Sequence, residues 1–180
     1  AKLVREVALH NPDILVMQDS RVPSHGAPEA TIPAAALFGF AHVFSEGQYV
    51  VASRFPLRDC KRGSIGYRRE DHPYIRCVVE AKGVALNVVT AHFESPRQGL
   101  NAARREGLEG VDDWQQNYKD RLAQARTLAR DLAGSGRPLI VAGDLNAPES
   151  SPVVRALLDI GLRDAFSSAG RGYGYTHGHA

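Results

Sequence analysis

Asp144 and Asn146 are the residues of this chain whose types and spacing most directly indicate chemistry. They follow the uninterrupted apolar run 138–142 and are two positions apart. A short apolar run predicts a buried parallel strand, and α/β sheets place their reactive groups at the carboxyl ends of such strands. If the backbone stays extended through Leu145, both side chains face one ligand. A carboxylate beside a carboxamide suits a hydrated cation and a phosphate oxygen, whereas the alternative is an Asx turn that only closes the strand.

Two further apolar runs also end in polar residues. Residues 14–17 lead into Asp19, and residues 85–91 lead into His92. Together with Asp144 and Asn146 they make the set that metal-assisted phosphoester hydrolysis requires: carboxylates for a divalent cation, a donor for the phosphoryl oxygens and a group that moves a proton. Taken alone, a histidine at a strand end is more often a structural residue than a catalytic one.

The elements that must position these residues are those of an α/β protein with a mixed sheet system. Residues 2–10 predict a helix that leads into the strand at 14–17, and residues 20–33 and 34–38 predict a loop and a short helix. Two hairpins are expected, at 41–45 with 48–53 and at 74–81 with 84–92. Two more helices are expected, one from a cap at Asp112 or Asp113 to Gly134 and one from Ser151-Pro152 to Gly161.

A long polar connection is expected between Ser95 and Asp113, before the clearest helix of the chain. Connections of this length in compact domains are often lids or binding loops. Arg97 lies on it, five residues after His92, and arginine suits a phosphate substrate. We therefore expect Arg97 to bind substrate, although a solvated loop charge is the simpler interpretation of such a residue.

Composition limits the functional classes without choosing among them. The 180 residues carry 22 Lys and Arg against 20 Asp and Glu, so net charge indicates neither a nucleic-acid nor a membrane partner. The apolar runs are too short to span a bilayer, no signal segment opens the chain, and the compartment stays open. Cys60 and Cys77 predict neither a metal cluster nor a disulfide framework, and Cys77 is expected to be a small buried residue. We expect a monomer with no obligate protein partner.

Four segments of the chain resemble the endonuclease/exonuclease/phosphatase superfamily, which has the deoxyribonuclease-I-like fold. They occur in family order and are 11–19 (NPDILVMQD), 51–57 (VASRFPL), 86–93 (LNVVTAHF) and 143–146 (GDLN), with Ser151-Pro152 after the last. Each motif alone is weak, but four in order make a chance match improbable. The resemblance implies a four-layer α/β/β/α sandwich with two mixed sheets, and a phosphodiesterase or phosphatase that depends on Mg²⁺ or Mn²⁺.

The resemblance also implies a role for each candidate residue. Asp144 would orient the attacking water, with general-base action as a further option, and Asn146 would donate to a phosphate or leaving-group oxygen. His92 would contact phosphate or transfer a proton. Asp19 would be the metal ligand, although the family usually has Glu there, which is longer by roughly 1.5 Å. His177 would contact substrate near its entrance, with a flexible loop as the alternative.

Two family elements are missing, namely an asparagine on the first strand and the final Asp-His and Ser-Asp-His motifs. We therefore expect residues 1–180 to be a single domain truncated at both ends, and inactive as it stands. The substrate class remains open among nucleic acid, phospholipid and small phosphate esters. The alternative function is a non-catalytic phosphate- or lipid-headgroup-binding module of the same fold, for which the shorter Asp19 is the best support.

Overall fold

The computed structural model describes residues 2–20, 38–67, 71–106 and 110–172. The helices are α1 (Lys2–His10), α2 (Arg97–Glu106), α3 (Gly110–Leu132), α4 (Pro152–Leu158) and α5 (Ala165–Ala169). The strands are β1 (Ile14–Met17), β2 (His42–Glu46), β3 (Tyr49–Ser53), β4 (Leu57–Ser64), β5 (Pro73–Ala81), β6 (Val84–Ala91) and β7 (Leu139–Val141). The short helix expected at 34–38 lies outside the described residues, apart from Phe38.

The strands form two sheets. The three-stranded sheet has the order β1-β3-β2 and is antiparallel throughout the described residues. The four-stranded sheet has the order β4-β5-β6-β7 and is mixed, because β7 pairs with β6 in parallel while the other pairs are antiparallel. Both predicted hairpins are present, as β2–β3 and β5–β6, and β7 is the predicted parallel strand.

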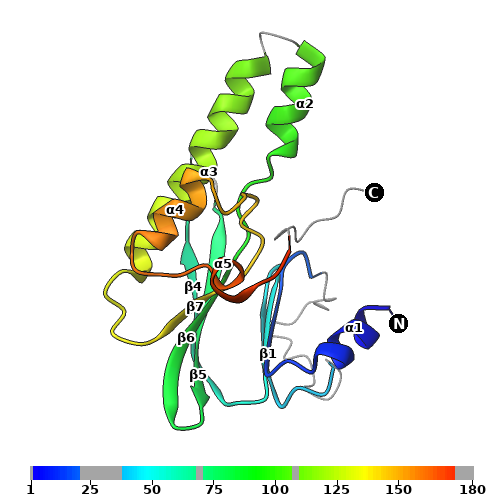
Figure 1. Ribbon diagram of the computed structural model, residues 1–180, viewed down its shortest axis with the longest axis vertical. Coiled ribbons are helices and arrows are strands. Elements are labelled where there is room, and N and C mark those ends of the chain that lie inside the picture. The colour runs from blue at the N-terminus through cyan, green and yellow to red at the C-terminus, as the bar shows by residue number, and fades with distance from the viewer. Residues whose placement is uncertain (1, 21–37, 68–70, 107–109, 173–180) are drawn as a thin grey trace.

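The layers are packed through two apolar clusters. Ile75 and Cys77 of β5 meet Tyr49 and Val51 of β3 between the two sheets. On the opposite face of the four-stranded sheet, strand alternation turns side chains such as Val89 toward α3 and α4. Figure 1 shows the resulting order of layers, from α3 and α4 through both sheets to α1. The predicted α/β class, with two sheets between helical layers, is confirmed.

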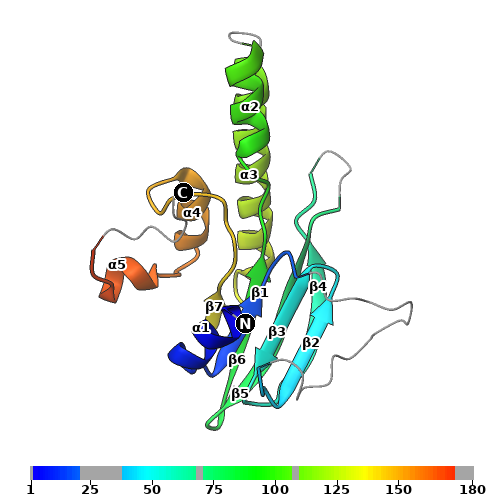
Figure 2. The ribbon, with the colours of Figure 1, turned by 90° about the vertical axis from the view of Figure 1, so that its right-hand side faces the viewer.

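The described part of the polar connection expected at 95–113 is largely helical instead. It contains α2 and the start of α3, and the two helices project together beyond the sheets (Figures 1 and 2). Close packing explains the difference: a Cβ at Gly99 would lie 2.9 Å from the Trp114 Cα, and one at Gly110 would lie 2.2 Å from the Ala102 carbonyl oxygen. Glycines are typical of loops in a sequence, but Gly99 and Gly110 instead let α2 and α3 approach each other closely.

Three further features of the fold were not predicted. Strand β4 pairs with β5 around a bulge between Arg58 and Lys61. A disulfide joins Cys60 to Cys77 across these two strands, a bond that the sequence did not predict, and Cys77 is buried as expected. Strand β7 is at the edge of its sheet and Ile140 is about half exposed, so this strand is not the fully buried one expected.

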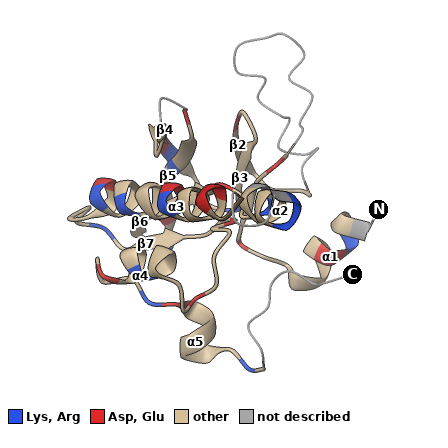
Figure 3. Cartoon of the chain, turned by 90° about the horizontal axis from the view of Figure 1, so that it is seen from above, with Lys and Arg blue, Asp and Glu red and all other residues tan. Residues whose placement is uncertain are grey.

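The mixture of charges on the surface of α3 agrees with the nearly balanced numbers of basic and acidic residues in the composition. Figure 3 shows Lys and Arg interspersed with Asp and Glu along the side of α3 that faces the viewer. Among the described residues, no helix combines the length and the apolar character needed to cross a bilayer.

Candidate active site

His92 lies where the two sheets meet, between the carboxylates of two strands. It follows the last residue of β6, and its side chain is 19% exposed. Its Nδ1 atom lies 2.9 Å from Gln48 Oε1 and 3.5 Å from Asp19 Oδ1. On the other side of the ring, Nε2 lies 3.9 Å from Asp144 Oδ2. An imidazole with a carboxylate on each side is a suitable group for moving a proton.

Asp19 is held at the end of β1 by its neighbours. The Gln18 amide nitrogen donates to Thr90 Oγ1 on β6 at 2.6 Å, and the Ser20 backbone nitrogen donates to the Gln48 carbonyl at 3.0 Å. Asp19 itself has a φ of 51° in the left-handed region, which Asp and Asn tolerate better than most side chains. Its side chain is 79% exposed, so a fixed backbone presents a solvated carboxylate beside His92.

Asp144 reaches the same place from the edge strand β7. It forms a parallel bridge with His92, and its carbonyl accepts from the Phe93 backbone nitrogen at 2.9 Å. The approach depends on Gly143, where a Cβ would lie 2.1 Å from the Ala91 carbonyl oxygen. The Asp144 side chain is 56% exposed, with Oδ2 toward His92.

Asn146 is not on a continued strand, so the premise that Asp144 and Asn146 share an extended backbone was wrong. Asn146 has a φ of 48°, and its backbone nitrogen donates to Asp144 Oδ1 at 3.0 Å, which is an Asx turn. The Asn146 side-chain nitrogen donates to the Phe93 carbonyl at 2.8 Å. The turn therefore brings the Asn146 amide back to the segment that follows His92.

The structure thus brings together four of the six residues predicted for the site. Arg97 is exposed in the first turn of α2, where its backbone nitrogen donates to Ser95 Oγ at 3.3 Å. His177 lies outside the described residues. The roles expected for Arg97 and His177 remain predictions.

Two residues of the site carried no signal in the sequence. Gln48 accepts from His92, and the Tyr49 hydroxyl accepts from the His92 backbone nitrogen at 3.1 Å while it donates to the Pro73 carbonyl at 2.7 Å. Burial raises the pKa of Tyr49 above 10.0, the negative charge of Asp19 adds to the effect, and the His92 backbone N–H and Arg62 oppose it. Tyr49 therefore remains a neutral hydroxyl that holds the strand end in place.

The donor set suits a cation that keeps most of its water. Among the described residues, no group of three or more His, Cys, Asp and Glu side chains is arranged to hold a metal ion. Mg²⁺, however, is commonly bound through one or two carboxylates while waters and substrate phosphates fill its other positions. The exposed carboxylates of Asp19 and Asp144 are compatible with that mode of binding.

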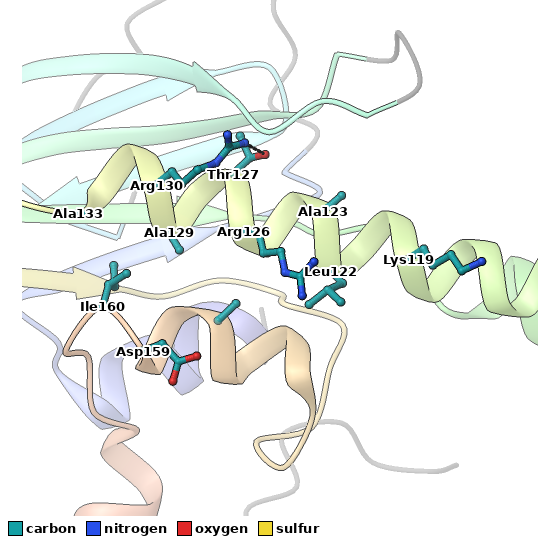
Figure 4. Close-up of a pocket in the computed structure, with 11 residues that line it drawn as sticks. Lys119, Leu122, Ala123, Arg126, Thr127, Ala129, Arg130, Ala133, Asp159 and Ile160 are labelled. Carbon is teal, nitrogen blue, oxygen red and sulfur yellow. Dashed lines mark hydrogen bonds between the residues drawn. The ribbon is translucent and has the colours of Figure 1, made fainter.

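A cavity of about 670 Å³ lies elsewhere, between α3 and α4. Leu122 and Ile160 are among its apolar lining residues, and Lys119, Arg126 and Arg130 line it as well (Figure 4). It contains none of the residues predicted to act in catalysis, so the candidate active site is the open junction of the strand ends.

The family model of endonucleases, exonucleases and phosphatases matches residues 1–180. The chain belongs to the endonuclease/exonuclease/phosphatase family. Members of this family are hydrolases that act on phosphoesters. The resemblance seen in the four sequence motifs is confirmed. No curated protein matches the chain at a significant level.

Solved structures share the fold of this family member at low identity. The human Nocturnin catalytic domain with bound sulfate anion is 19% identical, with a TM-score of 0.60 over 92% of this chain and 63% of that one. TDP2 from Caenorhabditis elegans is 19% identical, with a TM-score of 0.57 over 94% of this chain and 48% of that one. Humanized D. rerio TDP2 is 16% identical, with a TM-score of 0.54 over 91% and 59%. The chain thus spans less than two thirds of each of these proteins.

Proposed function

We propose that this protein is a divalent-metal-dependent phosphoester hydrolase in which water attacks phosphorus at the junction of the two sheets. The observation that carries the proposal is the position of His92 between Asp19 and Asp144, with contacts of 3.5 and 3.9 Å. Three strand ends supply these groups, and partly buried hydrogen bonds of Gln18 and Tyr49 hold the ends of β1 and β6. Charged groups fixed before the substrate arrives are the main source of transition-state stabilisation in sites of this kind.

Each residue has a role that follows from its surroundings. Asp144 orients the attacking water, since its side chain is 56% exposed while Oδ1 accepts from the Asn146 backbone nitrogen. His92 transfers or shares a proton with the phosphoryl group, because its Nε2 points away from Gln48. Asn146 supports the phosphate side of the site through its carboxamide. Arg97 and His177 remain candidates for contacts to the rest of the substrate.

Asp19 is the residue that would hold Mg²⁺ or Mn²⁺. Its exposed carboxylate suits a cation that keeps several waters, and the bridging waters compensate for a side chain shorter than glutamate. When bound, the cation would polarise the phosphoryl oxygens and neutralise charge that develops on them. Coordination through water also explains how a site with few protein ligands can be functional.

The direct test is hydrolysis by the full-length protein with Mg²⁺ or Mn²⁺ and after chelation. The substrates are a panel of nucleic acids, sphingolipids and inositol phosphates. We expect metal-dependent release from one class, and a loss of about 100-fold or more in kcat for Asp144→Ala, because general acid–base groups contribute about 10² to 10⁴-fold. Unchanged turnover in Asp144→Ala contradicts the assignment.

The same panel separates an enzyme from a binding module. A non-catalytic module would bind phosphorylated ligand without the cation, and calorimetry with and without Mg²⁺ would show equal affinity. Hydrolysis that disappears on chelation supports the enzyme. Binding without hydrolysis, in a protein with both termini of its natural sequence, supports the module.

A further inference from the structure

Three polar side chains of α3 lie under the candidate active site without being part of it. Asn117, Arg121 and Gln124 are spaced four and three residues apart, which places them on one face of the helix. Their exposed fractions are 8%, 7% and 0%. A buried helix face in this position would ordinarily be apolar, so these three residues require a physical explanation.

Each of the three holds backbone of a segment that carries a site residue. The Asn117 side-chain nitrogen donates to the Ser95 carbonyl at 2.9 Å, and Gln124 Oε1 accepts from the Glu94 backbone nitrogen at 2.9 Å. Both contacts fix the chain just after His92. The Arg121 Nη1 atom donates to the Asn146 carbonyl at 2.7 Å, which fixes the turn just after Asp144.

The two segments are also bonded to each other. The Phe93 backbone nitrogen donates to the Asp144 carbonyl at 2.9 Å, and the Asn146 side-chain nitrogen donates to the Phe93 carbonyl at 2.8 Å. One helix face therefore holds both segments that set the distance between His92 and Asp144. Moving either segment would change that distance.

Unpaired polar atoms on this helix face lower the stability of the fold. Their retention argues that these side chains have a role in the site. Asn117 Oδ1, Arg121 Nε and Gln124 Nε2 are buried with no protein hydrogen-bond partner among the described residues. Burying an unpaired polar atom costs free energy, because the atom loses its hydrogen bonds to water. Burial also lowers the pKa of Arg121, while Tyr118 and Glu94 act in the opposite direction. Residues that position a functional site are commonly retained although they lower the stability of the fold.

We propose that Asn117, Arg121 and Gln124 act together as a clamp that sets the spacing of His92 and Asp144, with Arg121 as the principal positioning residue. The catalytic part of this inference rests on the proposed phosphoester hydrolysis, whereas the structural part does not. Arg121 restrains its backbone partner most strongly of the three. A planar guanidinium holds a carbonyl oxygen in a more defined direction than the flexible ammonium of a lysine does.

The test compares Arg121→Met with Arg126→Met in the full-length protein. Arg126 is an exposed arginine on the same helix, so the two variants lose the same group. We expect Arg121→Met to lower kcat by about 10- to 100-fold with KM little changed, because misplacement of reacting groups by about 1 Å costs up to about 100-fold. Arg126→Met should match the wild type. Arg121→Lys should recover part of the loss, and it replaces Arg121→Met if that variant does not fold.

Amide hydrogen exchange gives a readout that does not depend on activity. In Arg121→Met the Phe93 amide should exchange faster, while the amides of the β5–β6 ladder keep their protection. Unchanged Phe93 exchange with unchanged kcat overturns the clamp, and so does an equal loss of protection throughout the chain, which would mean a general loss of stability. If the wild-type protein hydrolyses no phosphoester, the proposed function fails, and the exchange pattern still decides the clamp.

Discussion

His92 and Asp144 are adjacent across the parallel ladder of β6 and β7, and they are the first pair beyond the regular strands. The ring nitrogen Nε2 of His92 lies 3.9 Å from Asp144 Oδ2, while the Asp144 carbonyl accepts from the next residue, Phe93. The side-chain distance is thus set by backbone pairing at the place where the ladder ends. Any change that separates β7 from β6 at this end should alter the site before it unfolds the protein.

Gly143→Ala tests this dependence of the site on backbone pairing. The new Cβ would lie 2.1 Å from the Ala91 carbonyl oxygen, so β7 must shift away from β6. We expect the free energy of unfolding to fall by about 1–3 kcal/mol, as in other overpacked sites. The kcat of the remaining folded protein should fall as well. Urea unfolding and steady-state kinetics measure the two effects.

Gly134→Ala is the matched control for stability. Gly134 has a φ of 71° with no atom within 4 Å of a Cβ there, so alanine strains the backbone by about 1–2 kcal/mol without a clash. This position follows the end of α3, in the connection that leads to the start of β7. Equal loss of kcat in both variants would show that Gly143 acts through stability alone.

Asp19→Asn tests the expected metal ligand. Asparagine keeps the shape of aspartate and tolerates the left-handed φ of 51°, so only the charge is lost. The dissociation constant for Mg²⁺, measured by calorimetry, should rise at least about tenfold, since even groups that only orient a metal ligand contribute about 10- to 100-fold. The free energy of unfolding should stay within about 0.5 kcal/mol, because the side chain is 79% exposed.

Asp59→Asn is the control for this change. Asp59 is exposed and has a φ of 47°, and it lies at the bulge of β4. Magnesium affinity should be the same as in the wild type. If Asp19→Asn also binds Mg²⁺ with unchanged affinity, the cation is held by other residues.

Most of the strand and helix framework could be predicted from local patterns. The runs that became β1 and β7 are apolar and bounded by turn residues, and the α3 sequence repeats apolar residues at helical spacing. The strand-end rule then brought Asp19, His92 and Asp144 to one place. Local pattern was sufficient here because each residue is positioned by the strand that it follows.

Local pattern was insufficient where packing decides the structure. Strand β4 has the polar sequence LRDCKRGS and is extended because it pairs with β5. Helix α2 contains Gly99 and forms because that glycine packs against α3. Gln48 contacts His92 from 44 residues away, and Arg121 contacts Asn146 from 25 residues away. No spacing rule within a single element connects such pairs.

The Cys60–Cys77 disulfide should contribute to stability mainly through the unfolded chain. It closes a segment with a sequence separation of 17, and a loop of about 15 residues is stabilised by about 3 kcal/mol in the chain-entropy model. We expect the double variant Cys60→Ala/Cys77→Ala to be less stable by about that amount in urea unfolding. Reductant should shift the wild-type midpoint and leave the double variant unaffected. A wild type that keeps its midpoint after mass spectrometry shows both thiols free would contradict the prediction.

Tyr49 should make the protein sensitive to alkaline pH. Burial raises the pKa of Tyr49 above its ordinary 10.0, so the folded state keeps the proton after the unfolded chain has lost it. Stability is therefore fully present below about pH 10 and decreases as the pH rises from there through the folded pKa. Burial raises the pKa of Tyr74 in the same direction, so two groups contribute to the slope.

Tyr49→Phe isolates the contribution of this hydroxyl. At pH 8 the variant should lose about 1–3 kcal/mol, because the His92 backbone nitrogen and the Pro73 carbonyl each lose a buried partner. Between pH 10 and the folded pKa its free energy of unfolding should decline less steeply than that of the wild type. Urea titrations at closely spaced pH values measure both effects. Parallel curves for the two proteins above pH 10 would show that Tyr49 ionises equally readily in the folded and unfolded states, and that the strand end next to His92 is accessible to solvent.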